Sequence, residues 1–314
     1  MARRPAAAFR EVAPDIFQVT IPTPFPHETE SQAYLIRDEI PTLVDTGTGF
    51  GASGPALAEG LRRMGLKEVR LVLNTHEHID HAGGNLEAAP DAPIKMHPVA
   101  LEAVKRQADY RMPEEMWAKM PEAMRATFET GTRQFEALAR RPVELLREGE
   151  EVVLGNHTLR AIHTPGHAMG HLCFYEPKRR YLFTGDHVLG QGTPFVGIGD
   201  PISGDMGAYM AALERLLELE VDLLLPGHGP ALKEARARMV ETLEAKRRRE
   251  GRVFDALPGE PVSLKSVSKA AYADVRGLPG GFLMSSTEAY LRKLVAEGRA
   301  LRVVEGGKPR YARA

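Results

Sequence analysis

The chain has 314 residues, of which 43% are hydrophobic and 26% are charged. These proportions are typical of a globular protein, and the length allows a large core and two domains. No apolar run is long enough to span a membrane, and the single Cys173 excludes an internal disulfide. The N-terminus has no sustained apolar segment of a secretory signal, so the cytoplasm is the expected location.

The charge is distributed unevenly, although the formal net charge is only −1. Residues 244–314 contain fifteen Lys and Arg against eight Asp and Glu, a net charge of +7. This asymmetry marks the C-terminal part as a separate module. We therefore predict a catalytic domain over residues 1–235 and a linking helix with a second domain over residues 236–314.

The N-terminal part reads as short strands and one helix. Residues 15–21 and 32–36 predict a β-hairpin, and residues 42–45 predict a buried strand that runs into a glycine-rich turn. A helical pattern over residues 55–64 ends at Gly65. The buried strand predicted over residues 69–73 follows directly.

A cluster of metal-ligating residue types comes next, in the motif His-Glu-His-Ile-Asp-His of residues 76–81. In an extended segment, residues two apart point to the same side, so His76, His78 and Asp80 are expected to converge, with His81 close by. Imidazole and carboxylate together suit zinc, and also manganese or iron. The cluster therefore predicts a metal site. Glu77 lies between two of the candidate ligands and is expected either to support them or to lie at the surface.

Residues 98–147 read as helices with a stripe of methionines and aromatic residues at helical spacing. One interpretation is a lid that grips an acyl or other apolar tail, since methionine suits adaptable apolar contacts. The alternatives are a helical insert packed on the core and a contact surface of a homodimer.

The pattern of a strand, a turn and a potential ligand then recurs three times. Predicted strands over residues 159–162, 181–183 and 221–225 each lead into a turn. The potential ligands after these strands are His167, Asp186 and His228. Strand ends that meet at one edge of a sheet are a rigid support for a site.

The C-terminal part is predicted as a long helix over residues 232–257 and a small unit after it. The unit has a helix over 262–274, a turn at 277–281, and a helix over 287–297 capped by Ser285 or Ser286. A hairpin over 301–304 and 308–313 completes it. Two helices followed by a two-stranded hairpin resemble a winged helix-turn-helix.

The motifs THEHIDH, HTPGH, TGD and PGHG, over roughly residues 15–235, resemble those of the metallo-β-lactamase superfamily. The resemblance implies an α/β fold, the αββα sandwich, with two divalent metal ions at one edge. It implies that His76, His78 and His167 hold one ion and that Asp186 bridges the two. The second ion would be held by Asp80, His81 and His228.

The implied chemistry is hydrolysis, since two cations that share a water lower its pKa and polarise the oxygen under attack. Zinc is the expected metal, with manganese or iron as alternatives. Asp80 is expected to orient the nucleophile or relay its proton. His171 is a candidate catalytic residue that contacts substrate or a ligand, with a structural histidine as the alternative. Asp186 distinguishes the pattern from β-lactam-cleaving members, which generally lack this residue.

Residues 160–314 also resemble the β-lactamase-like protein 2 subgroup, which implies either thioesterases or single-strand endoribonucleases. The first hypothesis is therefore a hydrolase of small ester or thioester substrates that has no membrane partner. The second is a nuclease of single-stranded RNA whose basic tail contacts phosphates, and the third is a ligand-sensing DNA-binding regulator. Another reading of the C-terminal unit is that it packs beside the mouth of the active site and shapes it.

Overall fold

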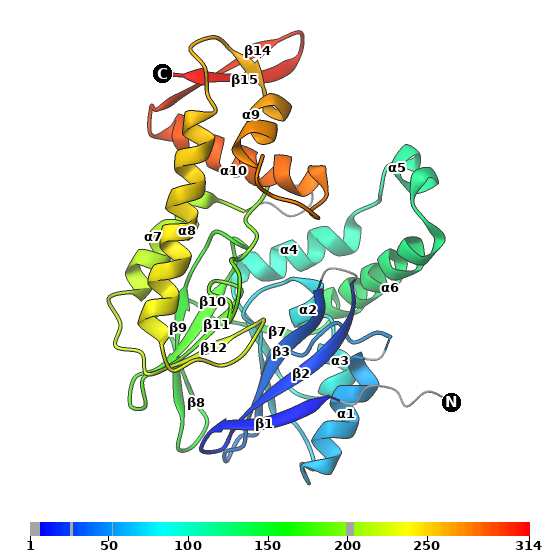
Figure 1. Cartoon of the computed structure of the whole chain (residues 1–314). Coiled ribbons are helices and arrows are strands. Elements are labelled where there is room, and N and C mark those ends of the chain that lie inside the picture. The colour runs from blue at the N-terminus through cyan, green and yellow to red at the C-terminus, as the bar shows by residue number, and fades with distance from the viewer. Residues whose placement is uncertain (1–6, 26–27, 52, 199–203) are drawn as a thin grey trace. The chain divides into compact units, whose positions relative to one another are not determined.

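The computed structural model describes residues 7–25, 28–51, 53–198 and 204–314, and the chain divides into two compact units (Figure 1). The first unit comprises residues 1–163, 170–191 and 221–235. The second comprises residues 164–169, 192–220 and 236–314. Residues 164–169 and 192–220, which lie within the predicted catalytic domain, therefore belong to the same unit as the C-terminal part. The functional domain boundary at residue 235 stays a prediction.

The first unit contains a seven-stranded sheet in which the strands follow chain order. The strands are β1 (Ala8–Ala13), β2 (Ile16–Phe25), β3 (Glu28–Ile36), β4 (Thr42–Val44), β5 (Leu71–Leu73), β6 (Ile94–Met96) and β7 (Val143–Leu145). Strands β1 to β4 pair antiparallel, and β4 to β7 pair parallel. The sequence did not predict β1. The expectation of helix up to residue 147 is wrong at β7, where pairing with β6 outweighs local propensity.

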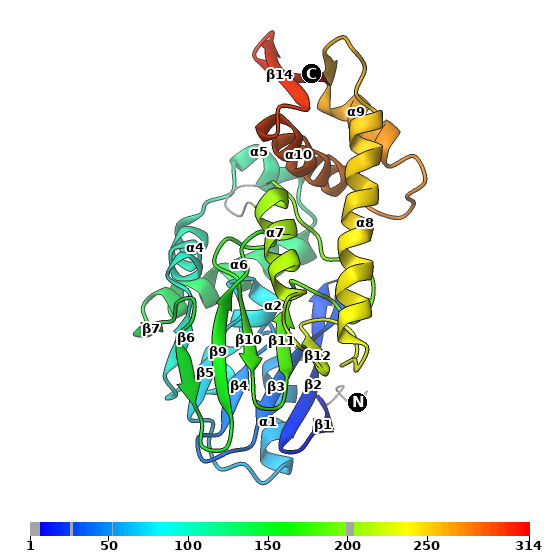
Figure 2. The same cartoon turned by 90° about the vertical axis from the view of Figure 1, so that its left-hand side faces the viewer.

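A second sheet of five strands has the order β12-β11-β10-β9-β8. Its strands are β8 (Glu151–Val153), β9 (Thr158–His163), β10 (Leu172–Glu176), β11 (Tyr181–Gly185) and β12 (Leu223–Pro226). Figure 2 shows this sheet in front of the first. One buried cluster draws side chains from both sheets, and the ring of Tyr34 meets the ring of Phe183 edge-on at 5.4 Å. Cys173 is buried in β10, which confirms that it is a core residue.

The first unit also contains the helices α1 (Ser53–Arg63), α2 (Ile79–Ala82), α3 (Asn85–Ala88), α4 (Pro98–Asp109), α5 (Glu114–Lys119) and α6 (Glu122–Ala139). Of these, α1, α4 and α6 pack on the other face of the first sheet. Leu57 of α1 packs with Val19 and Leu43, while α4 and α6 pack on β5 and β6. Both faces of this sheet are therefore buried, which explains the apolar runs of its central strands. Helix α5 contains no buried residue.

The second unit contains α7 (Met206–Leu216), most of α8 (Ala235–Asp255), α9 (Leu264–Ala271) and α10 (Gly280–Ala296). Strands β13 (Val262–Ser263), β14 (Ala300–Glu305) and β15 (Lys308–Arg313) form a sheet of order β13-β15-β14. The predicted hairpin is thus confirmed, and its role as a wing stays a prediction.

Helix α10 begins earlier than predicted, after Pro279 at its N-cap. The expected caps Ser285 and Ser286 lie inside the helix, so that prediction is wrong. Their hydroxyls make tertiary contacts instead: Ser285 donates to the carbonyl of Ile198, and Ser286 bonds the hydroxyl of Tyr272.

Candidate metal centre

The motif of residues 76–81 lies where β5 leads into the short helix α2. The backbone stays extended up to His78, the N-cap residue of α2, with φ −61° and ψ 148°. Asp80 and His81 lie on the helix itself. The expectation that Asp80 continues an extended segment is therefore wrong, because the turn into α2 begins at residue 79. Both side chains are nevertheless buried beside the other ligand candidates.

Two glycines let α2 lie against the loop that follows β4. A Cβ atom on Gly84 would approach the carbonyl oxygen of Thr46 to 2.3 Å. A Cβ atom on Gly83 would lie 2.6 Å from the carbonyl oxygen of Thr48. These distances are too short for any larger residue without movement of the backbone, so the two glycines set the position of α2.

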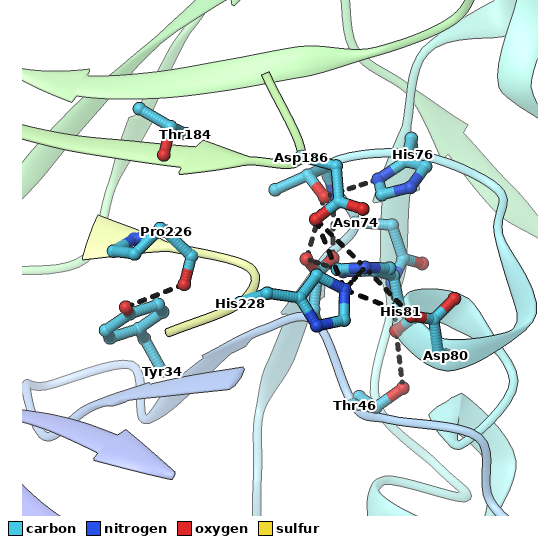
Figure 3. Close-up of polar contacts among 12 residues, drawn as sticks. Tyr34, Thr46, Asn74, His76, Asp80, His81, Thr184, Asp186, Pro226 and His228 are labelled. Carbon is cyan, nitrogen blue, oxygen red and sulfur yellow. Dashed lines mark hydrogen bonds and ion pairs between the residues drawn. The ribbon is translucent and has the colours of Figure 1, made fainter. Parts of the chain in front are cut away.

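The second sheet supplies Asp186 and His228. Strands β11 and β12 are parallel, so the residues after them emerge at one edge of the sheet. Asp186 Oδ1 lies 3.3 Å from His81 Nε2 and 3.4 Å from His228 Nε2. Asp80 Oδ2 lies 3.4 Å and 3.2 Å from the same two nitrogens (Figure 3). The carboxylates of Asp80 and Asp186 thus both lie beside the imidazoles of His81 and His228. These four residues follow the ends of three strands, β5, β11 and β12.

The donor set fits a divalent cation. The ligand atoms of His76, His81 and Asp186 lie within 4.8 Å of one another, as do those of Asp80, His81 and His228. All five residues are at most 9% exposed. The ring of His78 lies 4.5 Å from the ring of His76. Imidazole nitrogens mixed with carboxylate oxygens are the ligands that zinc, manganese and iron accept.

The electrostatics of the site favour positive charge at its centre. Burial opposes the charged form of His228, but Asp186 and Asp80 outweigh this effect and raise its pKa to about 11. The pKa of His81 rises well above its usual range against the same burial, chiefly through Asp186 and then Asp80. The two imidazoles hold the pKa of each carboxyl well below its usual value, although burial alone would raise it. Bound cations would satisfy the same demand for positive charge.

Asp45 holds the imidazole of His81 in position, a role that was not predicted from the sequence. Its carboxylate accepts the Nδ1 proton of His81 at 2.9 Å, and the amide and hydroxyl of Thr75 at 2.8 and 2.7 Å. This bond directs Nε2 of His81 toward Asp80 and Asp186. Asp45 is buried and has a φ of 60°, a conformation uncommon outside glycine. The available signal was its place at a strand end before a turn, the pattern shared with Asp186.

A backbone carbonyl orients His228 in a similar way. Its Nδ1 donates to the carbonyl of Glu30 in β3 at 2.9 Å, which directs Nε2 toward the carboxylates. The hydroxyl of Tyr34 donates to the carbonyl of Pro226 at 2.9 Å and holds the end of β12 (Figure 3). No motif in the sequence indicates these contacts, because they join residues almost two hundred positions apart.

His171 is fully buried in the first unit, and its Nε2 accepts the backbone amide of Asp186 at 3.2 Å. Its ring centroid lies 5.0 Å from that of His76. His171 thus contacts the backbone of one ligand candidate and the ring of another. Glu77 is only 3% exposed, which excludes the surface position, and burial raises its pKa to about 7.

His167 belongs to the second unit, in the loop of residues 164–169. Its Nδ1 donates to the carbonyl of Phe195 at 2.6 Å, which makes Nε2 the nitrogen for a metal. Its place beside His76 and His78 stays a prediction.

The family model described as the metallo-beta-lactamase superfamily matches residues 28–228. The chain belongs to this superfamily. It has the predicted α/β fold of that superfamily, and its His and Asp clusters agree with the divalent metals that the superfamily binds. No helix within the described ranges combines the length and apolarity that a membrane crossing requires.

Several known proteins resemble the chain. Lactamase-like protein adaB of Aspergillus niger is 30% identical over 215 residues, 68% of this chain and 54% of that protein. The chain thus spans about half the length of this relative. An atrochrysone carboxyl ACP thioesterase of Aspergillus chevalieri is 27% identical, over 81% of this chain and 69% of that protein. A beta-lactamase-like protein 2 homolog of Caenorhabditis elegans is 24% identical, over 82% of this chain and 75% of that protein.

The fold also matches solved structures. A metallo-beta-lactamase family protein from Thermus thermophilus has a TM-score of 0.80 and 25% identity, and the match covers 97% of this chain and 100% of that one. A beta-lactamase domain protein from Burkholderia ambifaria has the same TM-score at 24% identity, over 100% of this chain and 96% of that one. The fold therefore extends over nearly the whole chain.

Proposed function

We propose that this protein is a binuclear metal-dependent hydrolase of ester or thioester substrates. The observation that carries the proposal is the position of Asp186 Oδ1, within 3.4 Å of both His81 and His228. In the proposed assignment His76, His78 and His167 would hold one ion, and Asp186 would serve both ions. Asp80, His81 and His228 would hold the second ion. Zinc suits this histidine-rich set best, and manganese and iron remain compatible with it.

Bound divalent ions supply Lewis acidity that polarises a carbonyl and makes water nucleophilic near neutral pH. The residues of the chain position this chemistry. Asp80 is buried beside two ligand nitrogens, where its carboxylate can orient the attacking water and accept its proton. His171 receives the amide of Asp186 and so fixes the bridging carboxylate, which makes it a positioning residue in this proposal.

Two observations favour an acyl substrate over RNA. Proteins named carboxyl ACP thioesterases are among the relatives at 27% and 28% identity. Several basic residues of the C-terminal part are also paired with acids of the second unit. Ion pairs join Arg292 to Glu288, Lys293 and Arg299 to Glu250, and Arg310 to Glu305. Cations already paired in this way gain less from a phosphate backbone.

The test is a turnover panel of acyl thioesters, lactones and single-stranded RNA on the metal-loaded protein. We expect thioester hydrolysis that a chelator abolishes and that Asp186→Asn lowers by about a thousandfold, the scale of losing a transition-state contact. The exposed Asp222, which pairs with Arg180, provides the matched control Asp222→Asn with near-normal activity.

The panel also separates the alternatives. Cleavage of RNA with steep salt dependence and no thioester turnover would replace the proposal with the nuclease. Full activity of Asp186→Asn would remove the bridging role.

A further inference from the structure

Two aromatic side chains of the second unit pair at its surface. Phe195 lies in the loop after residue 192 and is 42% exposed, while Phe282 lies in the first turn of α10 and is 53% exposed. Their ring centroids are 5.0 Å apart at an interplanar angle of 56°. Paired aromatic rings in contact with water are costly, so such a pair indicates a binding surface.

The pair is built directly onto the loop that orients His167. The carbonyl of Phe195 accepts the Nδ1 proton of His167 at 2.6 Å, so the ring belongs to the residue that aims this ligand candidate. The side chains of Arg238 and Lys246 in α8 donate to the carbonyls of Gly192 and Pro194. Four hydrogen bonds to the carbonyls of residues 192, 194, 195 and 198 thus fix the loop within the second unit.

A glycine makes room for the pair. A Cβ atom on Gly197 would lie 2.3 Å from Cζ of Phe195 and 2.4 Å from Oγ of Ser285. The Phe195 ring therefore lies over the backbone of residue 197 and against the start of α10. Any larger residue at position 197 would displace the ring from Phe282.

We propose that Phe195 and Phe282 bind the apolar acyl part of the substrate and set the selectivity for acyl-chain length. This inference rests on the proposed function, since it assigns the part of the substrate that extends from the reacting carbonyl. If His167 holds a metal ion, the acyl chain of a substrate carbonyl bound there would begin only a few bonds from His167. Phe195, whose carbonyl orients His167, forms an exposed apolar surface together with Phe282 of α10.

The chemistry of the pair fits an acyl chain better than a nucleic acid. The helix that carries Phe282 has no charged residue in its first turn. Its basic residues Arg292 and Lys293 are paired with Glu288 and Glu250. Aromatic surface without available cations favours an uncharged apolar ligand.

The insert of the first unit offers a competing apolar site. Tyr110, Met112, Trp117 and Phe128 line a pocket there, and the ring of Trp117 lies 6.0 Å from that of Phe128. This pocket is the structural counterpart of the predicted lid. It provides a matched control, because Trp117→Ala removes an aromatic side chain at this pocket just as Phe282→Ala removes one at the surface pair.

The experiment measures kcat/KM for acyl thioesters from acetyl to decanoyl. For the wild type we expect a rise of about three- to fourfold per methylene over the first few added carbons. Phe282→Ala should flatten this rise, with a loss of about tenfold or more at decanoyl and the smallest loss at acetyl. Gly197→Ala should act in the same direction. Trp117→Ala and Val304→Ala, an exposed apolar residue of β14, should keep the wild-type slope.

A second measurement separates this inference from the proposed function. Calorimetry follows binding of a non-hydrolysable decyl thioether to the metal-free protein, which we expect Phe282→Ala to weaken about tenfold. Absence of thioester turnover together with this loss of binding would reject the hydrolase activity and retain the apolar surface. An unchanged slope in Phe282→Ala, a slope lost in Trp117→Ala, or a dimer that Phe282→Ala dissociates in sedimentation would overturn the inference.

Discussion

At the scale of single residues, the hydrogen-bond partners of the ligands decide how the site is assembled. The ligand candidates could be predicted because they occur as motifs at strand ends. Their partners could not be predicted, since Asp45 precedes His81 by 36 positions and Glu30 precedes His228 by 198. A sequence pattern does not contain such pairings until the two sheets are in place.

The carboxylate of Asp45 leads to the first prediction. Asp45→Asn keeps the shape of the side chain and removes the charge that receives the Nδ1 proton of His81. We expect the affinity for metal to fall about 10- to 100-fold, the usual effect of losing a ligand's hydrogen-bond partner. Zinc titration against a competing chelator measures it. Asp15 has the same φ of 60° but an exposed side chain, so Asp15→Asn is the control that should leave affinity unchanged.

A second buried carboxylate stabilises the first unit. The side chain of Asp38 is 1% exposed and accepts the backbone amide and Nδ1 proton of His157, both at 2.8 Å. Burial opposes its ionisation, but hydrogen bonds from Asn156 and His157 outweigh this and hold its pKa well below the usual value. A depressed folded-state pKa contributes stability above the unfolded pKa of about 3.9, and this contribution is lost as the pH falls.

Asp38→Asn is therefore expected to lower the free energy of unfolding by about 3 kcal/mol at neutral pH. The difference from the wild type should shrink as the pH falls below about 4. Urea unfolding at a series of pH values measures both effects. A difference that grows on acidification would contradict the assignment, and the exposed Asp222→Asn should stay within about 0.5 kcal/mol of the wild type.

At the scale of elements, most helices and strands follow from periodicity and turn residues. The errors occur where tertiary contacts outweigh local signals. Strand β7 forms because β6 offers it a parallel partner, and α10 is longer because the hydroxyls of Ser285 and Ser286 bond other elements. Asp80 lies on α2 because two glycines allow that short helix to pack closely.

Helix α8 leads to a prediction that depends on pH. Lys246 of α8 is buried, its ammonium lies 5.2 Å from the centroid of the Tyr209 ring, and burial lowers its pKa to about 7. Between pH ~7 and the unfolded value of about 10.4, the unfolded chain binds this proton more tightly than the folded chain does. This group therefore makes stability rise with pH over that window.

Lys246→Met should remove this rise, so that the free energy of unfolding of the wild type increases relative to that of the variant as the pH increases above 7. Unfolding curves across this range give the measurement. The exposed Lys269 of α9 serves as the control, because Lys269→Met should preserve the wild-type pH dependence. If the free energies of unfolding of the wild type and Lys246→Met instead change in parallel with pH, Lys246 keeps its proton over this range and the prediction is wrong.

At the scale of the whole molecule, the family could be predicted from four short motifs. The choice of substrate could not be predicted, because the side chains to which we assign it, Phe195 and Phe282, belong to no motif and meet only in the folded second unit. The uneven charge was also ambiguous in the sequence. Many of the basic residues that suggested nucleic acid are paired with acids of the same unit.

Metal removal should destabilise the protein as well as inactivate it. Without cations, buried Asp80 and Asp186 rely on protonated His81 and His228 for compensation. We expect a chelator to lower the melting temperature by several degrees, since ligands that bind only the folded state stabilise it. Added zinc should reverse this change, and scanning fluorimetry measures it. A melting temperature that responds neither to the chelator nor to zinc would contradict a metal in this site.

We propose above that the site uses two metal ions to hydrolyse a thioester. The most direct test of this proposal is a titration of zinc into the chelated protein, followed by thioester turnover at each step. We expect activity to rise until two equivalents are bound per chain and then to stay constant. Full activity at one equivalent, or turnover that ignores the metal altogether, would contradict the proposal.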